Sequence, residues 1–176
     1  MKRAGDDASS FEGKKVVLCV GNRYMRDDGF GHVVYRRLRG LELGPRVVVK
    51  ESVSADLATV WEFRSAKRLL VVDAVRSGSR PGTVSKFSLI PAKGSAGPLA
   101  GLHGLDLAGT VDLVSGGKAL IDAVIVGVEP KDTGAGEGLS TEVEAAIPRA
   151  VNAVLSELRA GEPEGRRRGP KPLKAN

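Results

Sequence analysis

Runs of apolar residues alternate with segments of helical periodicity along most of the chain. The runs at residues 16–20, 47–49, 69–72 and 123–128 are continuous and rich in β-branched side chains, which is typical of strands buried on both faces. Residues 82–90 form another candidate strand, preceded by turn residues. Because its apolar and polar positions alternate poorly, we place this strand at or near an edge of the sheet.

Four segments are predicted to be helices, most of them because their apolar residues recur at steps of three and four. They cover approximately residues 29–41, 54–61, 103–114 and 141–158. Ser54 is expected to cap the second helix through its side-chain oxygen, with Trp61 on the buried face. Pro148 lies inside the last pattern and should kink that helix or delay its start, since proline has no N–H to donate.

The alternation of strands and helices predicts an α/β domain with a mostly parallel sheet of five strands covered on both faces. At 176 residues the chain has the length of one domain. We expect this domain to span residues 14–160. Residues 1–13 are expected to form a flexible leader, and residues 161–176 a basic, disordered tail.

Composition and charge exclude several classes of partner. The formal charge of +6 could suggest nucleic acid, but half of the excess lies in the tail, which carries five basic and two acidic residues. With 4% aromatic residues and no nucleic-acid-binding motif, we expect no nucleic-acid partner. No stretch reaches the roughly 18 consecutive apolar residues of a membrane span, and the first residues lack the apolar core of a signal peptide. We therefore expect a cytoplasmic protein with no membrane partner.

The single cysteine limits the chemistry further. Cys19 excludes an internal disulfide and a metal site built from cysteines. It lies inside the first predicted strand, where a small buried apolar side chain is the expected role. The chain has no G-x-S-x-G motif for a serine nucleophile, so a nucleophilic triad is disfavoured.

Polar residues that could serve one site follow several of the predicted strands. In open α/β sheets, ligands bind beyond the carboxyl ends of the strands. Asp27 and Asp28 follow the first strand, Asp73 ends the third, and Glu129 follows the fifth. An acidic cap on the next helix explains one of the two adjacent carboxylates. Two of them would repel a phosphate, which disfavours a dinucleotide-binding enzyme.

A candidate metal site emerges from these residues together with a histidine. Asp73 alone could cap the turn that follows it, and His103 alone would be an ordinary polar contact, as we expect for His32. Together, Asp28, Asp73 and His103 offer two carboxylates and one imidazole. This set suits a borderline divalent ion with open coordination positions, such as zinc, nickel or iron.

Two other acidic residues compete for the same role. Asp106 and Asp112 could also be ligands, but positions on the polar face of a helix explain both of them adequately.

At this point the chain resembles the hydrogenase-maturation endopeptidases. The first loop, Gly21-Asn22-x-x-x-x-Asp27-Asp28-Gly29-x-Gly31, matches their opening motif. The similarity continues in order through Asp73-Ala74, His103, Gly127-Val128-Glu129-Pro130 and Gly138-Leu139-Ser140, and covers residues 14–159. Arg23, Tyr24 and Arg26 make the first loop more polar and basic than is usual in that family.

The resemblance implies a three-layer αβα sandwich with a twisted five-stranded sheet. It also implies an aspartyl-type endopeptidase that removes the C-terminal extension of a nickel-iron hydrogenase large-subunit precursor after nickel insertion. Asp28, Asp73 and His103 would then be catalytic by binding the nickel that the precursor supplies, and the peptidase need not carry a metal at rest. The residues expected to support this site are Gly21, Asn22, Asp27, Gly29, Gly31 and Glu129. The implied partner is the precursor, and we expect a monomer.

Two other functions remain open at this stage. One is a non-catalytic chaperone that binds nickel or the precursor on the same fold. The other is a peptidase that carries its own metal and acts on another target. Metal content after purification would separate the second from the substrate-nickel mechanism.

Overall fold

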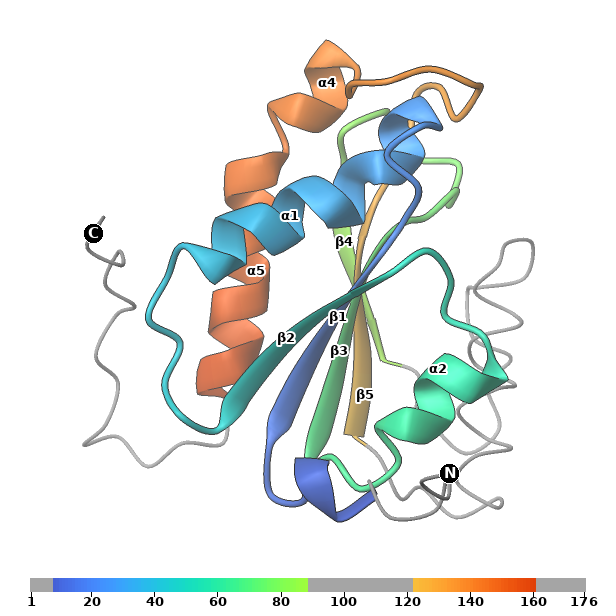
Figure 1. The fold of residues 1–176 in the computed structure, drawn as a ribbon. Helices are drawn as coiled ribbons and strands as arrows, with labels where there is room; N and C mark the ends of the chain where they lie inside the picture. The colour runs from blue at the N-terminus through green and yellow to red at the C-terminus, as the bar shows by residue number, and fades with distance from the viewer. Residues whose placement is uncertain (1–7, 89–121, 161–176) are drawn as a thin grey trace, which may run out of the picture.

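A computed structural model of the chain describes residues 8–88 and 122–160 (Figure 1). The helix predicted near residues 103–114, with His103, Asp106 and Asp112, lies outside these ranges, as does the predicted tail. No helix in the described ranges is long and apolar enough to cross a membrane. The cytoplasmic location stays a prediction.

The described strands form one five-stranded sheet in the order β2-β1-β3-β5-β4. Their bounds are Lys15–Val20 for β1, Val47–Ser52 for β2, Arg68–Ala74 for β3, Val84–Ser88 for β4 and Asp122–Val128 for β5. Every pairing is parallel except that of β4 with β5. The mostly parallel sheet is therefore confirmed, and β4 lies at its edge as predicted.

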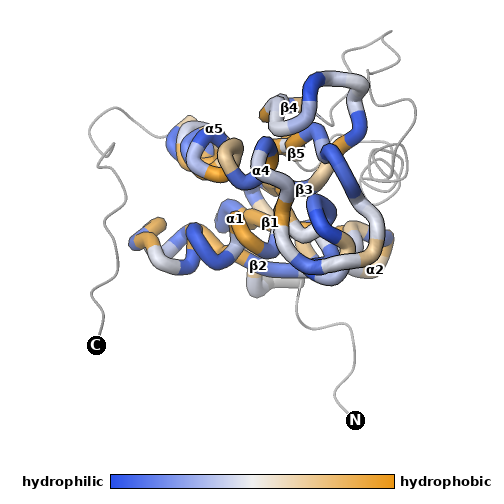
Figure 2. The backbone as a smooth tube through the Cα atoms, turned by 90° about the horizontal axis from the view of Figure 1, so that it is seen from above, coloured by the Kyte–Doolittle hydropathy of each residue, from blue (hydrophilic) through white to orange (hydrophobic). Residues whose placement is uncertain are grey.

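Helices cover both faces of this sheet (Figures 1 and 2). Helices α1 (Phe30–Arg39) and α5 (Ile147–Arg159) lie on one face, and α2 (Leu57–Glu62) lies on the other. Within β1, Val17 and Cys19 pack toward α1 and α5, whereas Val16 and Leu18 pack toward α2. This alternation follows from the two-residue period of a strand and confirms the three-layer αβα fold.

The second helix begins later than its sequence pattern suggested. Asp56, and not Ser54, is the N-cap of α2, and its carboxylate accepts a hydrogen bond of 2.9 Å from the Thr59 amide. The Ser54 hydroxyl donates to the same carboxylate. Trp61 is 50% exposed, so its predicted burial is wrong. Val60 and Phe63 pack toward the sheet, whereas Trp61 lies about 100° further around the helix than Val60.

Part of the segment predicted as a leader, from Ala8 onward, is folded against the domain. Residues Ala8–Phe11 form a 3-10 turn, η1. Phe11 is buried, and its ring contacts that of Phe63 edge to face at 5.0 Å between centroids. The packed domain therefore starts before residue 14, because the aromatic side chain of Phe11 is buried in the core.

The C-terminal helical segment confirms the effect predicted for Pro148. A short helix, α4 (Thr141–Glu144), is followed by a break, and α5 then begins with Pro148 in its first turn. A proline is tolerated there because the first N–H groups of a helix have no intrahelical partner.

Gly31 allows α1 to cross the end of β1 at close range. A Cβ atom at this position would lie 1.9 Å from the Val20 carbonyl oxygen. We expect Gly31→Ala to lower the free energy of unfolding by about 2 kcal/mol, because helix and strand must move apart. Urea denaturation measures this. Gly40→Ala is the matched control, since its nearest contact would be Arg37 at 3.5 Å, and equal losses in both variants would contradict this explanation.

Candidate functional site

The carboxyl ends of β1, β3 and β5 meet at one edge of the sheet and bring the predicted polar loops together. Strand β3 lies between β1 and β5 in parallel register. The first loop ends in η2 (Arg26–Gly29), a 3-10 turn that contacts β3. Asp28 in η2 and Asp73 near the end of β3 are therefore neighbours, as the sequence predicted for strand ends in an open sheet.

The first loop holds Asp28 in a defined position. Gly21 has a φ of +146°, and a Cβ atom there would lie 1.9 Å from the Asp28 carbonyl oxygen. Only glycine fits this close approach. The Asn22 amide donates to the Asp28 carboxylate at 2.9 Å, and the Asn22 side chain accepts from the Tyr24 amide at 3.0 Å. Gly21 and Asn22 thus support Asp28 through the backbone.

Asp73 is partly shielded from water at the end of β3. Its carboxylate accepts a hydrogen bond of 2.7 Å from the Ala74 amide. Burial raises the pKa of Asp73 to about 7, the Ala74 amide opposes this, and the charge of Asp28 adds to the rise. Within the described ranges no basic side chain forms an ion pair with Asp28 or Asp73. The pair is electrostatically suited to receive a cation.

Asp27 has a structural role that differs from that of its neighbour. It is fully buried, and its carboxylate accepts hydrogen bonds from the Lys131 amide at 2.8 Å, the Asp132 amide at 2.9 Å, and the Ser140 amide and hydroxyl at 2.6 and 2.9 Å. Burial alone would raise its pKa, but these hydrogen bonds outweigh burial and lower it. Asp27 therefore joins the first loop to the segment after β5.

The glycine-rich segment at residues 134–138 is tied to the first loop. The Arg26 amide donates to the Gly136 carbonyl at 2.8 Å, and the Gly136 amide donates to the Tyr24 carbonyl at 2.8 Å. The Arg26 side chain also pairs with Asp132 at 3.2 Å. Backbone hydrogen bonds between the two loops hold this segment in place. Local composition does not predict such bonds.

Glu129 orders the loop after β3. It is 8% exposed, and one carboxylate oxygen accepts from the Ser77 amide at 2.6 Å, the Ser77 hydroxyl at 2.8 Å and the Ser79 amide at 3.1 Å. This loop follows Asp73 directly, so Glu129 supports the site from the neighbouring strand. The sequence analysis gave Ser77 and Ser79 no role and named Ser140 only as part of a family motif. A Ser-x-Ser turn after a strand is the signal that could have drawn attention to the first two.

The third predicted ligand, His103, lies outside the described residues. Within residues 8–88 and 122–160 no group of three His, Cys, Asp or Glu side chains is placed to hold a metal ion. The assignment of His103 stays a prediction, while two members of the predicted set, Asp28 and Asp73, are brought together.

Two residues that the sequence excluded from catalysis are also accounted for. The His32 ring forms a hydrogen bond with the Glu51 carboxylate on β2, which is the ordinary polar contact predicted for it. Cys19 is fully buried, and burial raises the pKa of its thiol strongly. A thiolate nucleophile is therefore disfavoured at this position.

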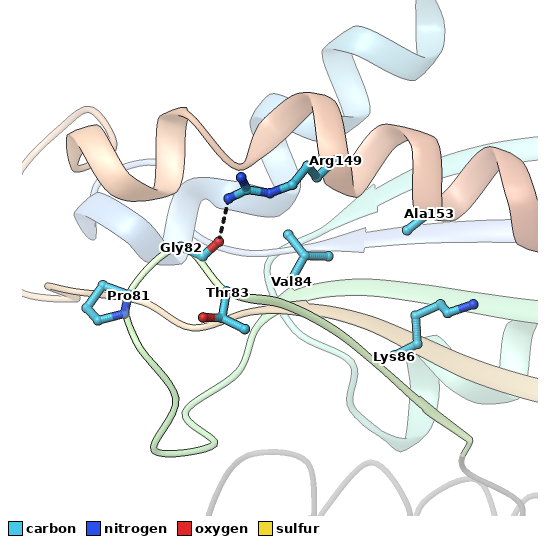
Figure 3. Close-up of a pocket in the computed structure, with 7 residues that line it drawn as sticks. All are labelled: Pro81, Gly82, Thr83, Val84, Lys86, Arg149 and Ala153. Atoms are coloured by element: carbon cyan, nitrogen blue, oxygen red, sulfur yellow. Dashed lines mark hydrogen bonds between the residues drawn. The ribbon is translucent and has the colours of Figure 1, made fainter.

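The described surface has two notable pockets. The larger, of about 580 Å³, lies between β4 and α5, where the Arg149 side chain donates to the Gly82 carbonyl at 3.1 Å (Figure 3). Its charged lining residues are Lys86 and Arg149, and it contains no carboxylate. The smaller, of about 410 Å³, adjoins η2 at Gly29. The carboxylate chemistry therefore lies nearer to the smaller pocket.

Fold and site together define an α/β protein with a pair of acidic side chains at the carboxyl end of its sheet, suited to bind a cation. Comparison of the sequence identifies the family. The model of the hydrogenase maturation protease family matches residues 47–157. The chain belongs to this family and is a peptidase.

Individual relatives agree with this assignment. The chain is 30% identical to the coenzyme F420 hydrogenase subunit delta of Methanothermobacter thermautotrophicus over 159 residues, covering 84% of this chain and 96% of the relative. It is 37% identical to the hydrogenase 3 maturation protease of Escherichia coli over 71 residues, or 39% and 45% of the two chains. The structure of the hydrogenase-maturating endopeptidase HybD from E. coli shares the fold, with a TM-score of 0.68 at 24% identity over 83% of this chain and 92% of HybD.

Proposed function

We propose that this peptidase removes the C-terminal extension of a nickel-iron hydrogenase large-subunit precursor, and that it recognises the nickel which the precursor already holds. Family membership supports the reaction class and the kind of partner. The observation that carries the nickel mechanism is the pair formed by Asp28 and Asp73, which lie at neighbouring strand ends and repel each other electrostatically. A divalent cation brought by the substrate would relieve this repulsion.

Asp28 and Asp73, joined by the predicted ligand His103, would complete the coordination of the precursor's nickel. Nickel accepts mixed oxygen and nitrogen ligands. Bound in this way, it would hold the scissile peptide at the edge of the sheet and polarise its carbonyl or a bound water as a Lewis acid. The donors to Asp28 and Asp73 are backbone amides, so both carboxylates keep lone pairs for the ion.

This arrangement makes the metal a condition for cleavage. A precursor without nickel lacks the group that the two carboxylates bind, so the enzyme would engage it poorly. Specificity then depends on the state of the precursor as well as on its sequence. The self-metallated alternative differs in one respect, because it predicts metal in the purified peptidase before any substrate is added.

The test is incubation of the peptidase with nickel-loaded and nickel-free large-subunit precursor, followed by intact mass spectrometry. We expect a single C-terminal truncation confined to the loaded sample, and no stoichiometric metal in the peptidase alone. Cleavage irrespective of nickel would retain the peptidase but overturn the nickel gate. Tight binding of loaded precursor without cleavage would overturn the proposed reaction.

A further inference from the structure

The smaller surface pocket is lined by basic side chains that have no role in the proposed mechanism. It lies between one face of α1 and the segment at residues 137–139. Gly29, His32 and Arg36 line it at helical spacing, while Arg23 and Arg26 come from the first loop. Glu137 is its only acidic lining residue. We call this feature the basic pocket.

The three arginines of the basic pocket differ in how far they are already engaged. Arg36 is exposed and has no ion-pair or hydrogen-bond partner for its side chain in the described part of the chain. The Arg23 guanidinium lies over the Tyr24 ring at 4.6 Å, which restricts its position. Arg26 pairs with Asp132 through its Nε atom at 3.2 Å. In the described part of the chain, Arg36 is thus the unpaired guanidinium of the pocket, while Arg26 is already paired with Asp132 and Arg23 lies near the carboxylates of Glu51 and Glu137.

The basic pocket shares a boundary residue with the loop that carries Asp28. Gly29 follows Asp28 directly in η2 and lines the pocket on the side of the first loop. A polypeptide bound at Asp28 and Asp73 would therefore lie close to the basic pocket. The volume of about 410 Å³ lies in the range of specific binding sites.

We propose that the basic pocket binds acidic side chains of the precursor polypeptide next to the scissile bond. This inference rests on the proposed function, since it assigns the pocket to the same substrate. Guanidinium groups bind carboxylates through paired, charge-assisted hydrogen bonds, and several of them around one concavity favour more than one carboxylate. The pocket would add a recognition element of the peptide chain to that of the nickel.

The variant that tests the basic pocket is Arg36→Glu, with Arg37→Glu as its matched control. Both positions are exposed on α1, and both changes reverse one charge. Arg37 does not line the pocket, because one residue turns the helix by about 100°. Any general effect of the altered net charge should therefore appear equally in both variants.

The first measurement does not require a hydrogenase. A capped tetraglutamate peptide and the isosteric tetraglutamine peptide are titrated into the full-length protein and followed by amide NMR shifts. We expect the glutamate peptide alone to shift Gly29, Val33 and Gly138, which line the pocket, and the shifts to disappear in Arg36→Glu but persist in Arg37→Glu. Equal binding of both peptides, or no binding by the wild type, would overturn the inference.

The second measurement separates this inference from the proposed function. With nickel-loaded precursor, Arg36→Glu should raise KM about fivefold with a much smaller change in kcat, and added salt should reduce the difference from wild type. If wild type cleaves the precursor and the two variants have equal KM values, the pocket assignment fails while the proposed function stands. If wild type does not cleave, the proposed function fails, and the peptide titration alone decides whether the pocket binds carboxylates.

Discussion

Replacing Asp73 by asparagine is expected to slow the cleavage of nickel-loaded precursor by about 10²- to 10³-fold, the usual cost of losing one electrostatic contact to the reacting centre. Asparagine keeps the shape and one oxygen of the side chain but removes the negative charge that a divalent ion requires of this ligand. Single-turnover cleavage followed by intact mass spectrometry measures the rate without contributions from product release.

The stability of the same variant distinguishes a lost ligand from a damaged fold. Burial raises the pKa of Asp73 to about 7, so its ionisation costs more in the folded protein than in the unfolded chain. This cost is absent below the unfolded pKa of about 4 and grows as the pH rises toward 7. Asp73→Asn should therefore be at least as stable as wild type at neutral pH.

A charge-matched variant completes the comparison for Asp73. Glu144→Gln removes one exposed carboxylate from α4 and should cleave at the wild-type rate. Cleavage by Asp73→Asn at that same rate would show that Asp73 does not bind the nickel, and the proposed mechanism would be wrong.

Asp27→Asn, unlike Asp73→Asn, is expected to destabilise the fold, with a loss of about 3 kcal/mol in the free energy of unfolding. The carboxylate of Asp27 is fully buried and accepts four hydrogen bonds from the segment at residues 131–140. The amide of asparagine would turn two N–H donors toward donors and leave buried amides without acceptors. Urea denaturation of the full-length chain at neutral pH gives the difference.

The pH dependence of the free energy of unfolding offers a second measure of the hydrogen bonds to Asp27. The pKa of Asp27 is lowered in the folded protein, so its contribution is present above the unfolded pKa of about 4 and is lost as the pH falls through the folded pKa. The stability difference between wild type and Asp27→Asn should narrow on acidification. A difference that is constant from neutral pH down into the acid range would argue against an ionised Asp27.

Asp28→Asn is the natural control for Asp27→Asn because it changes the adjacent residue in the same way. Asp28 is only partly buried and accepts one hydrogen bond, from the Asn22 amide. We expect Asp28→Asn to lose cleavage of loaded precursor while keeping most of its stability. If both variants lost stability equally, the division of roles between the two adjacent carboxylates would be wrong.

Most of the fold could be predicted from the sequence because its signals are local. The continuous apolar runs at residues 16–20 and 123–128 are long enough to require burial on both faces, and these strands are interior in the sheet. The poor alternation near residues 84–88 placed β4 at the edge. Pro148 indicated the late start of α5 because its ring excludes an interior helical position. In each case the structural preference comes from the backbone or side chains of the segment itself and does not depend on distant contacts.

The burial of individual side chains was harder to predict from the sequence. Trp61 fits the apolar pattern of its helix, yet it is half exposed, and Phe11 in a polar segment is buried against Phe63. Such outcomes depend on which space in the core a neighbouring element leaves open. The pattern along one segment carries no information on that space.

The candidate site shows the same division most clearly. Local motif and strand order were enough to bring Asp28 and Asp73 to one edge of the sheet. The family motif placed the metal at Asp28 and a supporting role at Asp27, but local chemistry gives no reason for this division, because the two residues are chemically identical and adjacent. Contacts with Lys131, Asp132 and Ser140, more than a hundred residues further along the chain, make Asp27 structural and leave Asp28 available. Burial and hydrogen-bond partners set the role of a carboxylate, and only the packing of distant segments supplies them.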